Sequence, residues 1–278
     1  MAVILDGKAL AKQVVAEVKQ EIANSGVKPG LAVVIVGDDP ASHVYVKNKK
    51  KDCEACGIHS EEFALSANET EERLLALIAE LNGRRDIHGI LVQLPLPKGF
   101  DERKVIQAIS PDKDVDAFHM LNMGHIFAGN QRFLPCTPAG VMEILDHYGI
   151  DPAGKHCVVV GRSNIVGKPQ AMLLLQRHAT VTICHSRTPD LGAMTRQADI
   201  LVAAVGKTNL ITADMVKPGA VVIDVAINRG ADGKLCGDVD YKAVEPIASH
   251  ITPVPGGVGP MTRAILMRNT LWAAKNLK

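Results

Sequence analysis

Residues 156–169 read HCVVVGRSNIVGKP, a short apolar run that passes into a glycine-containing turn and then into residues that favour a helix. We expect a strand over His156–Val160 and a helix that begins near Pro169. A glycine at the end of the strand allows a tight turn, and the first turn of the helix offers free main-chain N–H groups to a phosphate. This strand–turn–helix unit therefore indicates a nucleotide-binding α/β fold.

Two kinds of phosphate-binding turn can be tested against this segment. The ATP-binding loop has four residues between its glycines, followed by Lys and Ser or Thr. Here five residues separate Gly161 from Gly167, and Pro169 stands in place of the hydroxyl residue. The dinucleotide-binding turn G-x-G-x-x-G fits the context better, although Ser163 replaces its second glycine. A turn that binds nothing is the remaining alternative, and the neighbouring βα units favour the dinucleotide site over it.

The end of the next strand, Thr180–Cys184, indicates which dinucleotide binds. An NAD site usually has an acid there, about 20 residues further along, for the ribose 2′-hydroxyl. This chain has no carboxylate at that place and carries Ser186 and Arg187 instead. Because a hydroxyl and a guanidinium suit a 2′-phosphate, the sequence predicts NADP.

Strand-like and helix-like segments alternate along the rest of the chain, as in a parallel α/β sheet. The other expected strands lie at Leu31–Gly37, Ile87–Leu94, Asp199–Val205 and Ala220–Val225. The other expected helices run from Ser42, as N-cap, to Gly57, over Glu69–Leu81, from Thr137 to about Tyr148, and over Met261–Leu277. We place a domain transition between Asp116 and Gly154.

The composition excludes several classes of protein. The chain has 278 residues, enough for two domains, and 47% of them are hydrophobic. The 31 basic and 30 acidic residues leave a net charge of +1, too little to attract nucleic acid or an anionic membrane. The N-terminal apolar run is too short for a signal sequence and is interrupted by Asp6, and no stretch is long enough to span a bilayer. We therefore expect a cytosolic protein.

Two of the six cysteines, Cys53 and Cys56, form a C-x-x-C motif. Such a pair can be a redox centre or half of a zinc site. A second pair at zinc spacing is missing, and the motif lies in a helical pattern rather than at a strand-to-helix turn. We expect reduced structural thiols and no metal site.

A lysine-rich segment follows the first strong strand. Tyr45 and Lys49 are four residues apart and share one helical face. Lysines 47, 50 and 51 crowd Lys49, and like charges or burial lower the pKa of a lysine, which lets it act as a base near neutral pH. A run of lysines on a helix is more often a solvated face, and these residues alone favour that interpretation.

Seven short segments, taken in order, change the interpretation of the whole chain. They read YVKNK, VQLPLP, PDKDVDAF, PCTPAG, GRSNIVGKP, CHSRT and PGGVGPMT, and lie at Tyr45–Lys49, Val92–Pro97, Pro111–Phe118, Pro135–Gly140, Gly161–Pro169, Cys184–Thr188 and Pro255–Thr262. With them the chain resembles the bifunctional methylenetetrahydrofolate dehydrogenase/methenyltetrahydrofolate cyclohydrolase family. VQLPLP and PGGVGPMT argue against a two-lobed NADP dehydrogenase for hydroxy or amino acids, and the Tyr-x-x-x-Lys segment argues against an NADP-sensing module.

The resemblance implies an α/β fold with two lobes and a particular pair of reactions. Residues 1–121 and 262–278 would form the catalytic, folate-binding domain, and residues 122–261 a Rossmann-type NADP-binding domain, with folate in the cleft between them. The enzyme would oxidise 5,10-methylenetetrahydrofolate with NADP and hydrolyse the methenyl product to 10-formyltetrahydrofolate. The resemblance also implies a homodimer.

The resemblance further implies roles for individual residues. Lys49 would be the catalytic lysine, Tyr45 would pack on the folate, Gln93 would assist Lys49, and Asp116 would hydrogen-bond the pterin. Further substrate contacts are expected from Val92, Leu94, Pro255, Gly256, Gly257, Val258 and Gly259. NADP contacts are expected from Gly161, Arg162, Ser163, Ser186 and Ile227, together with Arg187 from the end of the second strand.

Two residues depart from the family pattern. Ala117 follows the aspartate of a segment that usually reads DVDG, and Ala226 lies in a segment that usually reads DVGIN. Each replaces a glycine and adds a methyl group near a ligand, which removes no reacting group.

Overall fold

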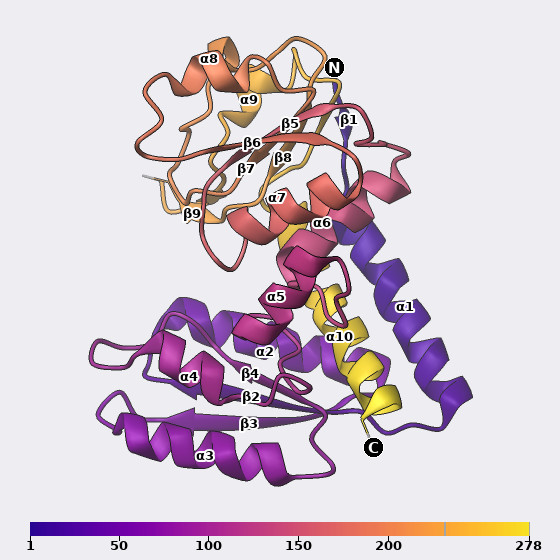
Figure 1. Ribbon diagram of the computed structural model, residues 1–278, viewed down its shortest axis with the longest axis vertical. Helices are drawn as coiled ribbons and strands as arrows, with labels where there is room; N and C mark the ends of the chain where they lie inside the picture. Colours follow the sequence, from indigo (N-terminus) through magenta and orange to yellow (C-terminus); the bar gives the residue numbers. More distant parts are fainter. Residues whose placement is uncertain (231, 278) are drawn as a thin grey trace. The chain divides into compact units, whose positions relative to one another are not determined.

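The computed structural model describes residues 1–230 and 232–277, and the chain divides into two compact units (Figure 1). Unit 1 comprises Met1–Ala11 and Pro135–Thr262, and unit 2 comprises Lys12–Leu134 and Arg263–Lys278. Each unit contains its own parallel sheet, so the expected two-domain α/β fold is confirmed. None of the helices in the described part of the chain is long and apolar enough to cross a membrane.

Unit 1 contains a six-stranded parallel sheet with the order β1-β11-β8-β7-β5-β6. Its strands are β1 Val3–Ile4, β5 His156–Val160, β6 Thr180–Cys184, β7 Ile200–Ala203, β8 Val221–Asp224 and β11 His250–Ile251. The chain passes from β5 to β6 on one side and then to β7 on the other side of β5. This reversal is the topological switch point, at whose carboxyl edge open α/β sheets bind their ligands.

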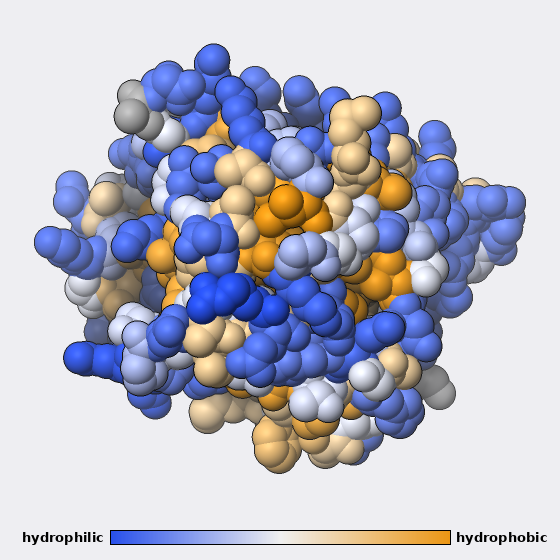
Figure 2. Space-filling model, turned by 90° about the horizontal axis from the view of Figure 1, so that it is seen from above, coloured by the Kyte–Doolittle hydropathy of each residue, from blue (hydrophilic) through white to orange (hydrophobic). Residues whose placement is uncertain are grey.

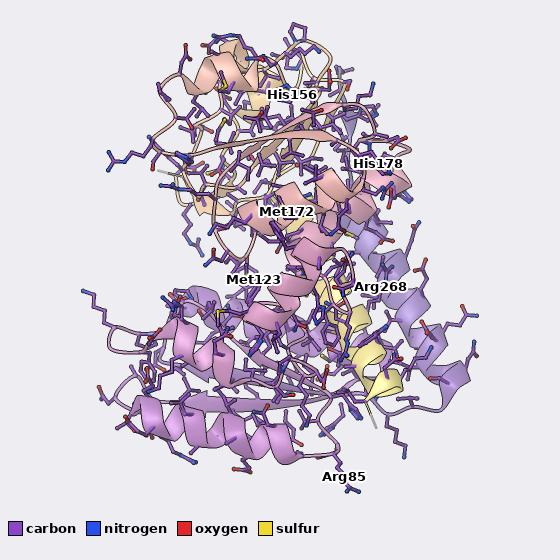
Figure 3. The ribbon with its side chains drawn as sticks, in the orientation of Figure 1. Arg85, Met123, His156, Met172, His178 and Arg268 are labelled. Atoms are coloured by element: carbon purple, nitrogen blue, oxygen red, sulfur yellow. The ribbon has the colours of Figure 1, made fainter. Side chains whose placement is uncertain are left out.

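Helices cover both faces of the unit 1 sheet. The helices and smaller elements are α6 Cys136–His147, α7 Gly167–Gln176, α8 Leu191–Thr195, the 3-10 helix η1 Ala213–Met215, the hairpin β9 Asn228–Arg229 and β10 Leu235–Cys236, and α9 Tyr241–Val244. Figure 1 shows α8 and α9 on one face and α6 and α7 on the other. Apolar strand residues such as Val158, Leu201 and Val222 form the core beneath α8 and α9. The strands themselves are also linked by side chains, since His156 Nε2 lies 2.9 Å from Thr182 Oγ1 on β6 (Figure 3).

Unit 2 is built on a three-stranded parallel sheet with the order β3-β2-β4. Its elements are β2 Gly30–Val36, α2 Pro40–Cys56, β3 His59–Leu65, α3 Glu71–Gly83, β4 Gly89–Val92, α4 Glu102–Ala108 and α5 Met120–Ala128. The helices α1 Gly7–Ser25 and α10 Val258–Asn276 begin in unit 1 and continue in unit 2. An ion pair of 3.5 Å between Arg268 and Glu17 links their unit 2 portions (Figure 3).

The units differ from the expected division of the chain in two segments and at Thr262, which belongs to unit 1. Residues 1–11 belong to unit 1, because β1 pairs with β11 through Val3 and Ile4. Residues 122–134 belong to unit 2, because Asn122 donates to the buried Asp114 at 2.8 Å and Phe133 packs edge-on against Trp272. Pairing partners far along the sequence decide both assignments.

Most of the expected helices and strands are confirmed, with two errors in how helices begin. Helix α2 is capped by Asp39, whose carboxylate accepts from Ser42 N at 2.8 Å, so Ser42 is not the N-cap. Pro40 follows the cap, as its fixed φ and missing N–H favour. Helix α6 begins after Pro135 without a side-chain cap, and the Thr137 hydroxyl instead lies 3.0 Å from that of Thr262.

Candidate functional site

Lys49 differs from the other lysines of α2 in its burial. It is only 8% exposed, whereas Lys47, Lys50 and Lys51 are exposed. The buried residues described for this helix lie at Ser42, Val46, Lys49, Cys53 and Cys56, the spacing of one helical stripe. The solvated-face interpretation is therefore correct for the three neighbours and wrong for Lys49.

Lys49 is joined to the end of β4 by a hydrogen bond. Its Nζ donates to Gln93 Oε1 at 2.9 Å. The Gln93 amide is oriented for this role, because its Nε2 donates to Leu94 O at 2.7 Å and its main-chain N donates to Val34 O at 2.8 Å. The structure thus brings together the lysine and the glutamine that the resemblance pairs.

Tyr45 lies one turn before Lys49, on the same face of α2, and is 36% exposed. Burial raises the pKa of its phenol, and the nearby Arg263 guanidinium partly opposes this effect. Arg263 also lies 3.2 Å from Asp52, a carboxylate whose own pKa is raised by burial.

Asp52 and Arg263 are polar groups near Tyr45 and Lys49 that the sequence analysis did not identify. The spacing of Tyr45, Lys49 and Asp52, at i, i+4 and i+7, could have indicated Asp52. Arg263 comes from α10, and no local pattern links it to α2.

Asp116 lies in the turn before α5 and is partly exposed. Its neighbour Asp114 is 2% exposed and accepts hydrogen bonds from His119 N and Asn122 Nδ2, both at 2.8 Å. Asp114 therefore holds the turn in which Asp116 lies. Ala117 is buried with a φ of 57°, a left-handed conformation that explains a glycine in the family pattern.

The glycine turn after β5 has the form of a dinucleotide site. Gly161 has a φ of 130°, and a Cβ there would lie 2.2 Å from Ala204 O, so only glycine fits. Arg162 and Ser163 are exposed. Ser163 Oγ accepts from the main-chain N of Val166 and of Gly167, both at 3.2 Å, and so organises the start of α7.

The other expected cofactor residues lie at the same edge of the unit 1 sheet. Val160 pairs with Cys184, and Gly161 N donates to Cys184 O at 2.9 Å, so the glycine turn and the loop after β6 leave the sheet together. Ser186 and Arg187 in that loop are exposed. These groups, with Arg162, suit the phosphates of NADP.

Ile227 and the PGGVG segment adjoin within unit 1. Ile227 is 39% exposed, and a Cβ at Gly259 would lie 3.1 Å from its Cδ1. Gly256 O accepts from Lys8 N at 2.8 Å, which fixes the segment against the start of α1. Two of the expected substrate-contacting side chains, Val92 and Val258, are buried at 7% and 1%, which leaves their main chains as the possible contacts.

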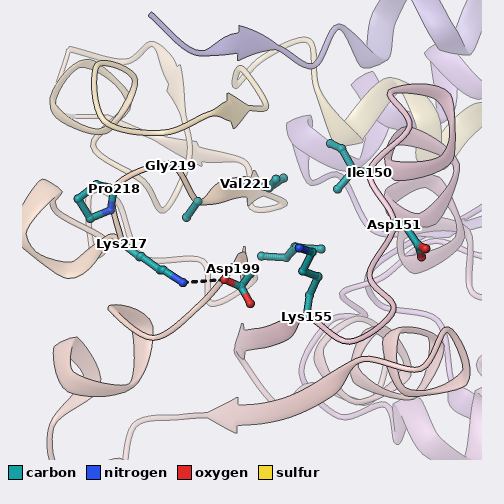
Figure 4. Close-up of a pocket in the computed structure, with 10 residues that line it drawn as sticks. Ile150, Asp151, Lys155, Asp199, Lys217, Pro218, Gly219 and Val221 are labelled. Atoms are coloured by element: carbon teal, nitrogen blue, oxygen red, sulfur yellow. Dashed lines mark hydrogen bonds and ion pairs between the residues drawn. The ribbon is translucent and has the colours of Figure 1, made fainter.

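A separate cavity lies at the opposite, amino edge of the unit 1 sheet (Figure 4). Its volume is about 260 Å³, and its lining includes Lys155, Asp199 and Lys217. The Asp199 carboxylate accepts from Lys217 Nζ at 2.7 Å, so these charges neutralise each other. Because strands bind ligands at their carboxyl ends in such sheets, this cavity is not the cofactor site.

The C-x-x-C motif consists of free, buried thiols, as expected. Burial raises the pKa of Cys53 to about 12 and that of Cys56 to about 11, so neither is a thiolate near neutral pH. No cluster of three or more metal-ligating side chains is found among residues 1–230 and 232–277.

Two family models match the chain. The model of the tetrahydrofolate dehydrogenase/cyclohydrolase catalytic domain matches residues 5–116. The model of the tetrahydrofolate dehydrogenase/cyclohydrolase NAD(P)-binding domain matches residues 135–278. The first match contains the Lys49–Gln93 pair, and the second contains the glycine turn and the loop after β6.

Relatives and solved structures match over nearly the whole chain. The bifunctional protein FolD of Moorella thermoacetica is 60% identical over 277 residues, covering 99% of each chain. The crystal structure of the bifunctional enzyme FolD from Campylobacter jejuni has a TM-score of 0.97 and 50% identity, covering 99% of each chain. The Trypanosoma brucei enzyme, solved in complex with NADP cofactor and an inhibitor, has a TM-score of 0.94 and 39% identity, covering 99% of this chain and 97% of its own.

Proposed function

This chain belongs to the tetrahydrofolate dehydrogenase/cyclohydrolase family. We propose that it catalyses two successive reactions and that different residues serve each of them. The first oxidises 5,10-methylenetetrahydrofolate to 5,10-methenyltetrahydrofolate with NADP. The second hydrolyses the methenyl compound to 10-formyltetrahydrofolate. The observation that carries this assignment is the buried Lys49 in unit 2, whose amine is hydrogen-bonded to Gln93. Unit 1 of the same chain has a glycine turn of the dinucleotide-binding type at the carboxyl edge of its sheet.

The dehydrogenase step needs orientation rather than a proton acceptor. Bound NADP accepts a hydride from the methylene carbon, and the flanking folate nitrogens stabilise the resulting cation. We assign the pyrophosphate to the turn at Gly161 and Ser163, where α7 begins. Arg162, Ser186 and Arg187 bind the 2′-phosphate, since their exposed donors lie at one edge of the sheet.

The cyclohydrolase step adds water to the methenyl carbon, and a proton must leave the attacking water. The neutral amine of Lys49 accepts that proton in our proposal. The Gln93 amide oxygen fixes the position of Lys49 Nζ at 2.9 Å, so the lone pair of the amine has a defined direction. Burial of the side chain limits competing contact with bulk water.

Folate recognition is assigned to Tyr45 and Asp116. The Tyr45 ring is half-exposed beside Lys49 and offers a flat face on which the folate ring system can pack. The Asp116 carboxylate accepts hydrogen bonds from the amino and ring N–H groups of the pterin, which the partial exposure of this residue allows.

A cytosolic homodimer is the expected state of the enzyme. Strand β6 is at one edge of its sheet, and Ile183 and Leu175 near it are 38% and 53% exposed. An apolar edge strand is a usual place for association through unit 1. The face drawn in Figure 2 is largely hydrophilic, with hydrophobic residues gathered in smaller patches. Sedimentation velocity gives the mass in solution, and a monomer at micromolar concentration would contradict the dimer.

Incubation of the purified protein with 5,10-methylenetetrahydrofolate and NADP tests the function directly. We expect NADPH, followed at its absorbance band, and 10-formyltetrahydrofolate as the final product. Parallel incubations with hydroxy or amino acids as reductants test the other two-lobed dehydrogenases. Failure to form NADPH from the folate substrate would contradict the proposal.

A further inference from the structure

Two buried aspartates lie at the carboxyl edge of the unit 1 sheet, outside the groups assigned above. Asp224 ends β8 and is 3% exposed, and Asp238 follows β10 and is fully buried. A buried carboxylate is costly unless hydrogen bonds satisfy its oxygens. The partners of these two carboxylates therefore show what they hold in place.

Asp238 collects the main-chain N–H groups of three successive residues. Its Oδ2 accepts from Val205 N at 2.6 Å and Gly206 N at 3.1 Å, and its Oδ1 accepts from Lys207 N at 2.6 Å. Asn228 Nδ2 adds a fourth hydrogen bond at 3.0 Å. Successive N–H groups around one anion form a nest, and here the protein's own carboxylate fills it.

Asp224 fixes the main chain at Asp238 and Val239. Its two oxygens accept from Asp238 N at 3.0 Å and Val239 N at 2.9 Å. A Cβ at Gly237 would lie 1.9 Å from Asp224 Oδ2, so only glycine lets the chain pass over this carboxylate. The two aspartates thus connect β8 to the loop 205–207 through a continuous set of hydrogen bonds.

The loop 205–207 lies beside the glycine turn. It follows β7, which pairs with β5, and Gly161 packs against Ala204 O immediately before the loop. The carboxyl ends of β5 and β7 form the topological switch point, where open α/β sheets bind ligands. Residues Val205, Gly206 and Lys207 are exposed, although their main-chain N–H groups donate to the buried Asp238.

We propose that Asp238 is a positioning residue for the NADP site. It holds the loop 205–207 in the conformation that binds the dinucleotide beside the glycine turn. Asp224 fixes Asp238 for this role. The inference rests on the proposed NADP site and adds to it a residue that is too deeply buried to touch the cofactor.

Hydrogen exchange of the protein without cofactor tests the geometry first. We expect the amides of Val205, Gly206 and Lys207 to exchange slowly, although the loop is at the surface. The amide of Thr208, the next exposed residue, is a matched internal control and should exchange rapidly. Rapid exchange at all of residues 205–207 would overturn the inference, whether or not the protein uses NADP.

The variant Asp238→Asn tests the consequence for binding. In this variant an NH2 group replaces one of the two acceptor oxygens of Asp238. That NH2 group then faces main-chain N–H groups, with which it cannot form a hydrogen bond. We expect the dissociation constant and the KM for NADP to rise at least about tenfold, the loss expected when one hydrogen bond to a charged group is removed. The KM for folate should remain near that of the parent. Asp240→Asn, a partly exposed helix cap two residues further on, is the matched control.

A selective rise in the NADP constants supports the positioning role. Unchanged NADP affinity in folded Asp238→Asn, or an equal loss of affinity for NADP and folate, would overturn it. If Asp238→Asn does not fold, Asp224→Asn tests the same connection one step away and should show a smaller NADP-selective effect. Slow exchange in a parent protein that fails to use NADP would contradict the proposed function and leave the loop geometry intact.

Discussion

Replacement of Lys49 by Met separates the two proposed reactions. Hydride transfer needs alignment of the methylene carbon and no proton acceptor, whereas hydration of the methenyl carbon needs one. Met keeps the unbranched, buried stem of the lysine and removes only the amine. We therefore expect Lys49→Met to retain dehydrogenase activity and to accumulate methenyltetrahydrofolate.

The expected magnitudes follow from the contacts of Lys49. Loss of general base catalysis should lower the cyclohydrolase rate by about 10²–10⁴-fold. The variant loses the 2.9 Å hydrogen bond from the Lys49 amine to Gln93, and a hydrogen bond between neutral groups contributes about 0.5–1.5 kcal/mol. It also no longer buries a polar amine, which offsets much of that loss. The free energy of unfolding should therefore change by no more than about 2 kcal/mol.

The assay follows NADPH, methenyltetrahydrofolate and 10-formyltetrahydrofolate in one preparation. Lys50→Met is the matched control, because Lys50 is the next residue of the same helix and is exposed. It should leave both rates near those of the parent. Thermal unfolding of all three proteins shows whether the fold is retained.

A parallel fall of both activities, with a raised KM for folate, would refute the base assignment. Lys49 would then only position the substrate, together with Tyr45. Loss of hydrolysis with retained hydride transfer would support it, and the pH dependence of the remaining rate would show whether another base replaces the amine.

Four further predictions concern other parts of the molecule. Ser186→Asp should weaken NADP binding and not NAD binding, because the new carboxylate repels a 2′-phosphate, and equal effects on both cofactors would contradict the NADP site. Asp116→Ala should weaken folate binding by about 10- to 150-fold with NADP affinity unchanged, as titration of each ligand would show. A thiol reagent should label Cys236 first in the native protein, since it is the partly exposed one of the six cysteines, and early labelling of another would contradict the burial pattern. Burial, together with a smaller contribution from the nearby Asp238, raises the pKa of Asp224 from 3.8 to about 7, so the folded state binds more protons between these values. Its contribution to stability should fall as pH rises through this range, and an unchanged pH dependence of unfolding in Asp224→Asn would contradict this.

Local patterns predicted the strands that consist mainly of apolar and β-branched residues. His156–Val160 and Thr180–Cys184 are β5 and β6 with the expected bounds, because apolar runs flanked by turn residues have few alternative structures. Strand β3 was not predicted, since its sequence HSEEFAL is half polar and the strand is partly exposed at the edge of its sheet. Propensity alone cannot identify such a strand, because pairing with β2 stabilises it.

The candidate site divides in the same way. The glycine turn and the loop after β6 follow from local chemistry, whereas the importance of Lys49 came only from the family resemblance. Its burial depends on packing around α2, which no helical pattern of four lysines reveals. Asp238 was not predicted at all, because its partners at Val205, Gly206 and Lys207 lie on another loop, and spacing along the chain does not encode that contact.

The pairing of β1 with β11 has a consequence for synthesis of the chain. Val3 and Ile4 are synthesised well before their partners in the sheet, His250 and Ile251. At about 5–20 residues per second, the first strand waits on the order of 10–50 s for its place in the sheet. During that interval its apolar residues remain unpaired. We therefore expect nascent chains that stall before residue 250 to depend more on chaperones than the finished protein does.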